Sequence, residues 1–327
     1  MTIPCPVCLA QLGPLGKCYT TQELFDLLKP VRFSPQTFAE HNDQSEATEL
    51  YRCTGCGLEI FLPPIIATPQ FYIEAYKLDG SGQVGDFSYS DKKWDFDEAA
   101  KDLRTEFSIL EIGCGPGSFL DRVKSVVRNP IGVEFNESAL DAARHKGHRV
   151  FELGALPETL RGTFDAVFSF HVLEHVLDPF AFLKEAGTWA RPGGLIGISL
   201  PNQDGPIRLI EPCIQNMPPH HATRWRDSTF KASAHRLDWR IERVAFEPLT
   251  ENNAYYYSTY LGAYLFPGKT PLHVFAQQAS EVLAGTLLKV FFATLRLFGR
   301  TSTNLLKGQA MYVAMRKRGE SGSFGAV

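Results

Sequence analysis

An apolar run that leads directly into three closely spaced glycines constrains the fold of this chain more than any other feature. Residues 109–112 are strand-like, Gly113, Gly115 and Gly117 follow at alternate positions, and a helical pattern begins at Ser118. Glycines are needed where the backbone turns sharply and a ligand must approach without a Cβ in the way. The helix behind them would offer free N–H groups and a positive dipole end, which suit an anionic or carboxylate-bearing ligand. The segment therefore predicts a ligand-binding strand, loop and helix.

Two carboxylates narrow the choice of ligand. Glu111 stands two residues before Gly113, and Glu134 ends the next strand-like run, 21 residues after Gly113. A dinucleotide fingerprint needs glycine at the sixth position of G-x-G-x-x-G, where this chain has Ser118. A carboxylate at the end of the second strand can accept hydrogen bonds from both ribose hydroxyls. We therefore expect a cofactor that contains a nucleoside, with a nicotinamide oxidoreductase as a disfavoured alternative.

Short apolar runs alternate with helical patterns from residue 107 onward. The strand-like runs are residues 108–113, 130–135, 164–170 and 193–200, and the helical patterns are residues 118–128, 137–146 and 179–190. This alternation is typical of a doubly wound α/β fold with a mostly parallel sheet and right-handed crossovers. Residues 239–247 and 309–316 read as two late strands.

The character of the sequence changes several times along its 327 residues, which are enough for one large α/β domain and a small module. We expect a cysteine-rich module at residues 1–62 and a linker with a helical lead-in at residues 63–106. The α/β domain is expected at residues 107–318, with residues 250–305 as an aromatic and then helical insert. Residues 319–327, rich in glycine and serine, are expected to form a flexible tail.

Two C-x-x-C pairs define the N-terminal module. They are Cys5 with Cys8 and Cys53 with Cys56, and 44 residues separate the pairs. Two residues between cysteines let both thiolates point at one tetrahedral ion, and four thiolates close its coordination shell. The pattern predicts a structural zinc site of zinc-ribbon type, with Cys18 as a spare cysteine. Reduced cysteines or a redox pair are the alternatives.

Three motifs resemble those of class I S-adenosylmethionine-dependent methyltransferases. Residues 109–119 (ILEIGCGPGSF) resemble motif I of that family, residues 164–176 resemble its fourth-strand motif with an HVLEHV ending, and residues 191–194 resemble the turn into strand five. The resemblance covers residues 105–317 and implies a seven-stranded sheet with one late antiparallel strand. The N-terminal cysteine pattern and the PPHH…RW segment at residues 218–225 resemble methyltransferases of saccharides and natural products.

The resemblance implies S-adenosylmethionine as the cofactor and gives roles to individual residues. Glu111 would face the amino group of the methionine moiety, Glu134 would hold the ribose, and Leu153 or Glu152 would flank the adenine. His171 would lie beside the cofactor, and Cys114 would be a small packed side chain rather than a nucleophile. The predicted cofactor-binding residues are Glu111, Gly113, Cys114, Gly115, Gly117, Glu134, Phe135, Leu153 and His171.

Methyl transfer to a hydroxyl or an acidic carbon needs a base near the acceptor, and histidine is the commonest choice. In the family that the chain resembles, the loop after strand five covers the acceptor, and this loop contains His220 and His221. We expect His221 or His220 to be the base, with Glu174 or His175 as its partner near the methyl group. The alternative is that one of these histidines only packs the loop.

Two nearby features allow two interpretations each. Arg224 either holds an acidic or phosphorylated substrate or pairs with a neighbouring carboxylate such as Asp227. The aromatic stretch from Tyr255 to Phe266 either packs as core and lid or forms a wall against which the acceptor stacks.

A helical run follows at residues 281–298. Its apolar residues share one face, which predicts burial against the domain or a second subunit, with attachment to a membrane surface as an alternative. These residues are Val282, Leu283, Leu287, Val290 and Leu297.

Charge and targeting signals limit the partners that we expect. The formal net charge is −3, and no basic face accompanies the cysteine pairs, which disfavours nucleic acid as a partner. The start of the sequence lacks a secretory pattern, and no apolar run is long enough to span a bilayer, so we expect a cytoplasmic protein. A small-molecule acceptor and a monomer or homodimer are the primary expectations. An RNA methyltransferase, a non-catalytic cofactor-binding scaffold and peripheral contact with a membrane are the alternatives.

Overall fold

The computed structural model describes residues 2–29, 33–75, 93–266, 270–297 and 307–319. The chain forms two compact units. The first comprises Met1–Pro201, Ile214–Ala245 and Tyr312–Val327, and the second comprises Asn202–Cys213 and Phe246–Met311. Residues 76–92 of the expected linker and residues 320–327 of the expected tail lie outside the described residues. No helix of the described part of the chain is long and apolar enough to cross a membrane.

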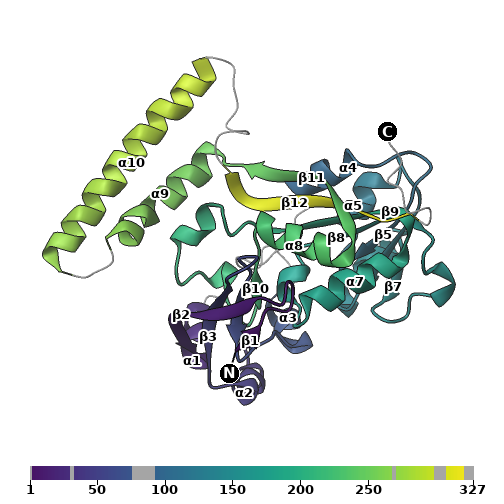
Figure 1. Ribbon diagram of the computed structural model, residues 1–327, viewed down its shortest axis with the longest axis horizontal. Coiled ribbons are helices and arrows are strands. Elements are labelled where there is room, and N and C mark those ends of the chain that lie inside the picture. Colours follow the sequence, from purple (N-terminus) through teal and green to yellow (C-terminus); the bar gives the residue numbers. More distant parts are fainter. Residues whose placement is uncertain (1, 30–32, 76–92, 267–269, 298–306, 320–327) are drawn as a thin grey trace. The chain divides into compact units, whose positions relative to one another are not determined.

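A seven-stranded sheet forms the framework of the α/β fold (Figure 1). Its strand order is β11-β12-β9-β8-β5-β6-β7. The bounds are β5 Ser108–Ile112, β6 Arg128–Glu134, β7 Arg149–Glu152, β8 Phe164–Phe170, β9 Ala190–Pro201, β11 Trp239–Pro248 and β12 Lys307–Lys317. Five of these strands, from β7 through β6, β5 and β8 to β9, pair in parallel, while the complete sheet is mixed. The predicted α/β class and both late strands are confirmed.

Five α-helices of the first unit belong to the α/β fold. They are α4 Trp94–Ala100, α5 Ser118–Val123, α6 Glu137–His145, α7 Pro179–Trp189 and α8 Asp227–Leu237. Local capping explains two of the starts: Asn136 accepts hydrogen bonds from the first turn of α6, and Asp178 does so for α7, which begins with proline. The pattern at residues 118–128 predicted a longer α5, and that length is wrong, because the chain turns after Val123 to enter β6.

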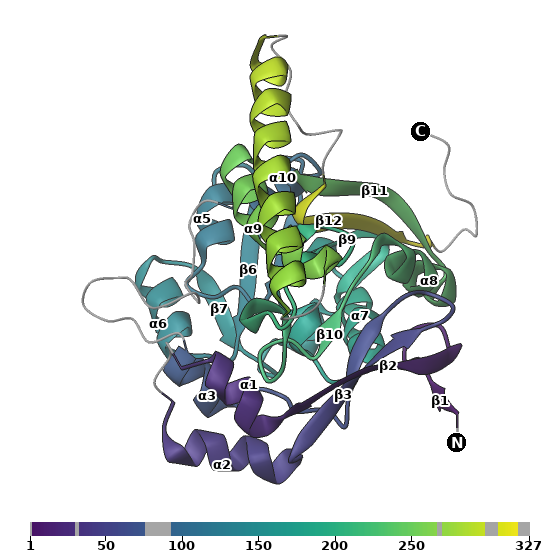
Figure 2. The same cartoon turned by 90° about the vertical axis from the view of Figure 1, so that its left-hand side faces the viewer.

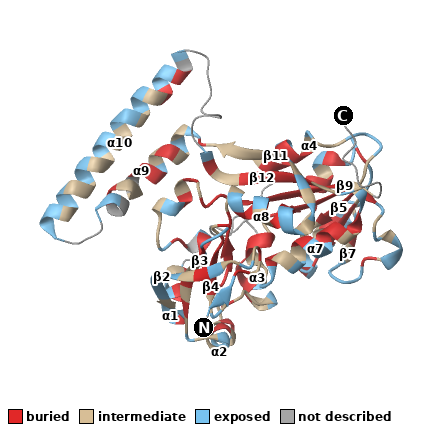
Figure 3. Cartoon of the chain, viewed as in Figure 1, coloured by how far each residue is buried: buried red, intermediate tan, exposed pale blue. Residues whose placement is uncertain are grey.

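Aromatic side chains from the sheet and the neighbouring helices form the core of the α/β fold. Phe119 of α5 packs against Phe168 and Phe170 of β8, with ring centroids 5.3 and 4.7 Å away, and Phe96 of α4 joins them. The strands around this core, β8 and β9, are largely buried, and Figure 3 shows red colouring in the sheet near the label of β9. This packing fixes the carboxyl end of β5, where the glycine loop begins.

A second sheet of five strands, ordered β1-β2-β3-β4-β10, contains the cysteine pairs. Its bounds are β1 Ile3–Pro4, β2 Gln11–Thr20, β3 Ala47–Cys53, β4 Glu59–Leu62 and β10 Thr223–Arg224, and helices α1 Thr21–Leu27, α2 Pro35–Gln44 and α3 Pro69–Ala75 accompany it. Figure 2 shows β2 and β3 side by side. Strand β10 comes from the loop after β9, which the sequence did not predict to be part of this sheet.

The second unit contains a pair of helices, α9 Glu251–Leu265 and α10 Pro271–Leu297. The aromatic stretch is therefore itself helical, and Tyr257 packs with Phe292 and Leu295 of α10 in a small core. Five apolar residues of α10 are exposed rather than packed on α9, and their expected burial against the domain or a second subunit stays a prediction; they are Val282, Leu283, Leu287, Val290 and Leu297.

Candidate active site

The glycine loop joins β5 to α5 in a conformation that only glycine adopts readily. Gly113 and Gly117 have φ angles of +79° and +81°. A Cβ on Gly113 would lie 2.4 Å from Cγ2 of Val172, so even alanine would clash there. The sequence therefore places glycine where the backbone is left-handed and where the loop approaches the end of β8.

A cavity of about 420 Å³ opens beside this loop. Of the nine predicted cofactor residues, eight line it; the exception is Gly117, whose Cα faces the ring of His148. The sequence analysis missed Tyr72 of α3 and Lys93 and Phe96 at the start of α4, which also line the cavity. They come from the region predicted to be a linker, and no spacing or motif in the sequence marks them.

Glu134 at the end of β6 is held by backbone N–H groups. Oε2 accepts a hydrogen bond from Gly115 N at 2.8 Å, and Oε1 accepts bonds from Phe135 N at 2.8 Å and Asn136 N at 2.9 Å. Its side chain therefore joins the glycine loop to the end of the neighbouring strand. A carboxylate fixed in this way on a cavity wall is suited to accept hydrogen bonds from a pair of hydroxyl groups.

Glu111 on β5 is buried in a different way. It is 2 % exposed, and its Oε2 has no hydrogen-bond partner among the described residues. Burial raises the pKa of this carboxyl well above its usual range, and the nearby Glu134 and Asp95 act in the same direction while Lys93 opposes them. A buried carboxylate oxygen without a partner, in a residue that lines a cavity, suits a cationic ligand group.

Cys114 packs within the glycine loop and is 4 % exposed. Burial raises the pKa of its thiol above the usual range, and the carboxylates of Glu111 and Glu134 add to that effect. A thiol that resists ionisation is a poor nucleophile, which favours a packing role.

His171 follows β8 and links three elements of the site. Its Nε2 lies 3.0 Å from Oδ2 of Asp95 on α4, and its Nδ1 lies 3.4 Å from Oε1 of Glu174. Burial acts to lower the pKa of this imidazole, but the two carboxylates outweigh it and raise the pKa to about 9. His171 is therefore positively charged at neutral pH. Asp95, its closest partner, was not predicted from the sequence.

The four predicted catalytic residues lie in one cluster, which contacts His171 through Glu174. Glu174 is 1 % exposed, and its Oε1 lies 4.0 Å from Nε2 of His175 and 4.0 Å from Nε2 of His221. The rings of His220 and His221 stack with centroids 4.5 Å apart, and His175 meets both edge-on. Of these four residues, only His175 lines the cavity.

The histidines of this cluster favour their neutral form. Burial lowers the pKa of His175, and it lowers the pKa of His220 and His221 well below the usual range, where the charges of neighbouring histidines add to it. Nδ1 of His175 hydrogen-bonds to the backbone carbonyl of His220, which leaves Nε2 with the lone pair. The cluster is therefore able to accept a proton. Its three imidazoles, with ligand atoms within 4.8 Å of one another, also have the chemistry to hold a metal ion.

The four paired cysteines meet at one point of the N-terminal sheet. Sγ of Cys5 lies 3.7 Å from Sγ of Cys56, and Sγ of Cys8 lies 3.3 Å from Sγ of Cys53. Thiolates around a tetrahedral ion at about 2.3 Å are separated by roughly 3.8 Å, so the set is close to the arrangement that zinc requires. The backbone N–H groups of Gly55 and Cys56 point at the Cys53 sulfur, as is usual around bound thiolates.

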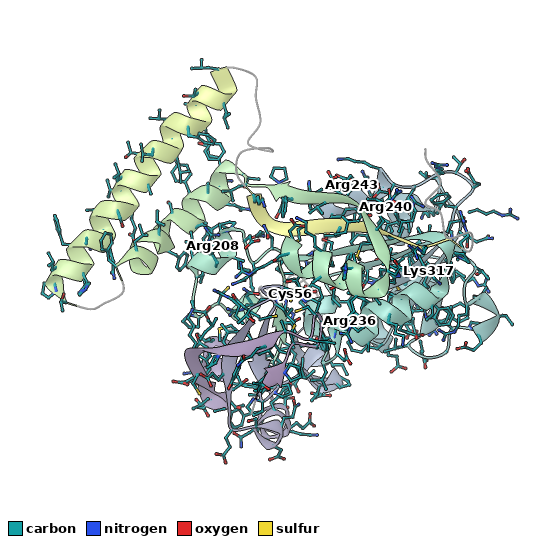
Figure 4. The ribbon with its side chains drawn as sticks, viewed as in Figure 1. Cys56, Arg208, Arg236, Arg240, Arg243 and Lys317 are labelled. Atoms are coloured by element: carbon teal, nitrogen blue, oxygen red, sulfur yellow. The ribbon has the colours of Figure 1, made fainter. Side chains whose placement is uncertain are left out.

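The second cysteine pair holds the segment that follows the histidines. Ser228 and Thr229 donate hydrogen bonds to the carbonyl of Cys56 at 2.8 and 3.1 Å. Arg236, labelled with Cys56 in Figure 4, donates to the backbone carbonyls of Pro6 and Val7. The loop that contains His220 and His221 leads into α8, and these hydrogen bonds attach α8 to the sheet that carries the cysteines.

Arg224 is part of the same attachment. It is 3 % exposed and pairs with Glu59 of β4 across 3.5 Å, with Arg52 and Arg226 on the same carboxylate. The sequence analysis named Asp227 as a candidate partner and did not consider Glu59, because β4 is more than 160 residues away along the chain.

The sequence of the chain is similar to those of known methyltransferases. Residues 89–253 match the family model described as a methyltransferase domain, which is half of the chain. The protein named "Probable S-adenosylmethionine-dependent methyltransferase Rv3030" of Mycobacterium tuberculosis is 33% identical over 105 residues, which are 30% of this chain and 37% of that protein. The ubiquinone biosynthesis O-methyltransferase of Caulobacter vibrioides is 28% identical over 119 residues, 34% of this chain and 47% of its own length.

These alignments cover less than half the length of either curated relative. A solved structure of a methyltransferase from Archaeoglobus fulgidus superposes on 68% of this chain and 91% of its own, with 19% identity and a TM-score of 0.44.

The strand order, the glycine loop and the carboxylate at the end of β6 define a Rossmann-like fold of the S-adenosylmethionine-dependent methyltransferase class. With the match over residues 89–253, the chain belongs to the methyltransferase domain family.

Proposed function

We propose that this protein transfers a methyl group from S-adenosylmethionine to an oxygen or carbon atom of a small-molecule acceptor. The observation that carries this proposal is that His175, a neutral imidazole, lines the same cavity as Glu111 and Glu134. The cavity thus combines residues suited to bind the cofactor, which we call the cofactor end, with the imidazole of His175. We call His175 and the buried cluster behind it, Glu174, His220 and His221, the acceptor end. The resemblance of the cysteine pattern and the PPHH…RW segment supports a saccharide or related metabolite as the acceptor.

The cofactor end fits S-adenosylmethionine, which supplies an electrophilic methyl group when bound. The Oε2 atom of Glu111, without a partner among the described residues, suits the ammonium of the methionine moiety. Glu134 would hold the ribose hydroxyls, and Phe135 and Leu153, which are 47 and 66 % exposed in the structure, would cover the adenine. Gly113, Cys114 and Gly115 would form the wall nearest the sulfonium, with His171 beside them.

The acceptor end provides the base. The sequence predicted His221 or His220 for this role; the geometry favours His175, because it alone among the four catalytic candidates lines the cavity. Nε2 of His175 would remove the acceptor proton, and Glu174, 4.0 Å away, would stabilise the imidazolium that results. His220 and His221 would support His175 from behind through its ring and its Nδ1 hydrogen bond.

The cysteine set would hold a structural zinc ion through Cys5, Cys8, Cys53 and Cys56. Four sulfurs close the coordination shell, so the ion would have no open position for catalysis. Its contribution would be to fix the sheet to which β10 and the segment after the histidines are attached.

The proposal is tested by calorimetric titration of the full chain with S-adenosylmethionine and, separately, with NADH, alongside metal analysis and a screen of acceptors. We expect micromolar binding of S-adenosylmethionine alone and one zinc ion per chain. Binding of NADH, or no binding of S-adenosylmethionine, would contradict the cofactor assignment. Binding without turnover of any acceptor in a panel of sugars, phenols and β-dicarbonyl compounds would favour a non-catalytic scaffold.

A further inference from the structure

Helix α10 exposes more apolar surface than a helix of a monomeric protein normally does. Eight of the 19 large apolar residues that are exposed in the described chain lie in this one helix of 27 residues. Contiguous exposed apolar surface of this kind usually marks an interaction site. The eight, with their exposed percentages, are Leu272 (76 %), Val274 (41 %), Phe275 (69 %), Val282 (72 %), Leu283 (60 %), Leu287 (61 %), Val290 (61 %) and Leu297 (84 %).

One face of α10 is already covered by α9. Phe292 and Leu295 are buried in the small core of the second unit, and Gln277 donates a hydrogen bond to the carbonyl of Phe266 at 2.9 Å. The two helices also come close at Gly262, where a Cβ would lie 2.5 Å from the carbonyl oxygen of Gln277. The exposed apolar residues therefore lie on a second face, which we call the outer face of α10.

Exposed Lys289 lies at the edge of the outer face, with its Nζ 6.0 Å from the ring of Tyr255 on α9, and the outer face itself contains no charged residue. Its members are all exposed and recur with helical spacing; they are Leu272, Phe275, Ala279, Val282, Leu283, Thr286, Leu287, Val290, Ala293, Thr294 and Leu297. The two hydroxyl groups on this face are bonded within the helix, from Thr286 Oγ1 to the carbonyl of Val282 and from Thr294 Oγ1 to that of Val290, both at 2.8 Å. The face is therefore suited to complete burial, because none of its side-chain polar groups would lose a partner.

We propose that the outer face of α10 binds the outer face of a second copy of this chain. In a two-fold interface the same surface of both copies forms the contact, so an uncharged face binds its copy without electrostatic repulsion. Leu283, Leu287, Val290, Thr294 and Leu297 are spaced by four, three, four and three residues, which is the repeat of helices that pack in a left-handed pair. A 27-residue helix is about 40 Å long, which is long enough for an interface of about 800 Å² per partner.

A lipid surface suits this helix less well. A helix that lies in a membrane interface needs a polar face opposite its apolar one. In α10 the opposite face packs on α9 through Phe292 and Leu295. Two apolar faces are typical of a helix inside a bundle, and a second copy would supply the missing neighbours by forming a bundle of two α9–α10 pairs.

Light scattering and sedimentation equilibrium of the full chain over a range of concentrations would test the proposal. We expect the wild-type protein to be a dimer, and the double variant Leu287→Glu, Val290→Glu to dissociate roughly a hundredfold more readily, because it buries unpaired charge. Gln278→Glu is the matched control, since it adds a carboxylate to an exposed position of the same helix beside the outer face, and it should remain a dimer. A far-ultraviolet circular dichroism spectrum and a thermal unfolding transition equal to those of the wild type would show that the double variant is folded.

A monomeric wild-type protein at micromolar concentration would overturn the proposal, and so would a double variant that remains a dimer. Flotation of the wild-type monomer with vesicles of anionic phospholipid would assign the outer face to lipid instead. Because the oligomeric state does not depend on cofactor binding or turnover, this experiment is independent of the proposed function.

Discussion

The cofactor end and the acceptor end of the site hold their carboxylates in opposite ways. Glu134 at the cofactor end accepts three backbone hydrogen bonds of 2.8 to 2.9 Å, whereas neither oxygen of Glu174 at the acceptor end has a hydrogen-bond partner among the described residues. Glu174 instead faces imidazoles at 3.4 to 4.0 Å. A group that is fixed by the backbone is suited to binding, and a group whose partners are titratable side chains is suited to proton transfer.

The two ends also differ in how they are assembled. Most of the cofactor end comes from one continuous stretch, from β5 through the glycine loop and α5 to the end of β6, and Leu153 and His171 join it from the ends of β7 and β8. The acceptor end combines the turn after β8, the loop before β10 and α4, which are held together by packing and by the cysteine sheet. Variants at the two ends should therefore separate binding from turnover.

The largest effect is expected for His175→Ala. Loss of the base that lines the cavity should lower kcat about 10²- to 10⁴-fold, while the affinity for S-adenosylmethionine should change less than about twofold. The measurement is steady-state turnover of the acceptor found in the screen, together with calorimetric binding. The double variant His220→Ala, His221→Ala should lower kcat as well, because it removes the two rings that pack against His175 and orient it. Full activity of both variants would show that the catalytic base is not a histidine of this cluster.

Glu134→Ala should act on binding instead. It removes two charge-assisted hydrogen bonds to the ribose, so the Kd for S-adenosylmethionine should rise about 100-fold. Glu137→Ala is a matched control, because Glu137 is an exposed carboxylate in the first turn of α6 that does not line the cavity. An unchanged Kd for Glu134→Ala would contradict the ribose role and with it the contrast between the two ends.

The same difference in assembly explains what the sequence was able to predict. Most residues of the cofactor end are close together in the sequence, so strand pattern, glycine spacing and the family resemblance together identified eight cavity residues without a structure, with Leu153 and His171 coming from the resemblance alone. At the acceptor end, motifs identified Glu174, His175, His220 and His221, but not that His175 alone would line the cavity. Asp95, Tyr72 and Glu59 carry no local pattern; their roles arise only when distant segments fold together.

Loss of metal from the cysteine set should affect the acceptor end only. Cys53→Ser should reduce the bound zinc from one ion per chain to a small fraction. It should also increase hydrogen exchange in residues 218–229, because β10 and the donors to the Cys56 carbonyl depend on that sheet. We expect kcat to fall about tenfold and the Kd for S-adenosylmethionine to stay within about twofold. Cys18→Ser, at an exposed cysteine outside the set, is the control. Equal loss of cofactor affinity would show that the cysteine sheet supports both ends.

The smallest effect is a dependence of stability on pH at the junction of the two ends. The pKa of His171 is raised to about 9 in the folded protein, against an ordinary value of about 6.5. The imidazolium paired with Asp95 and Glu174 therefore stabilises the fold fully below pH 6.5, and this contribution is lost as the pH rises through about 9. Because the side chain is 32 % exposed, solvent screens the pairs, and we expect a loss of only about 1 kcal/mol or less.

This dependence is measured from urea unfolding at pH 7 and pH 9.5 for the wild type, for His171→Gln and for the control His145→Gln, which changes an exposed histidine on α6. The wild type and the control should lose more of their free energy of unfolding between the two pH values than His171→Gln does. An equal loss in all three proteins would mean that His171 is not charged in the fold, and that the carboxylates of Asp95 and Glu174 are compensated in another way. In that case the acceptor end would carry more negative charge than we infer, and burial would lower the pKa of His175 without help from the charge of His171.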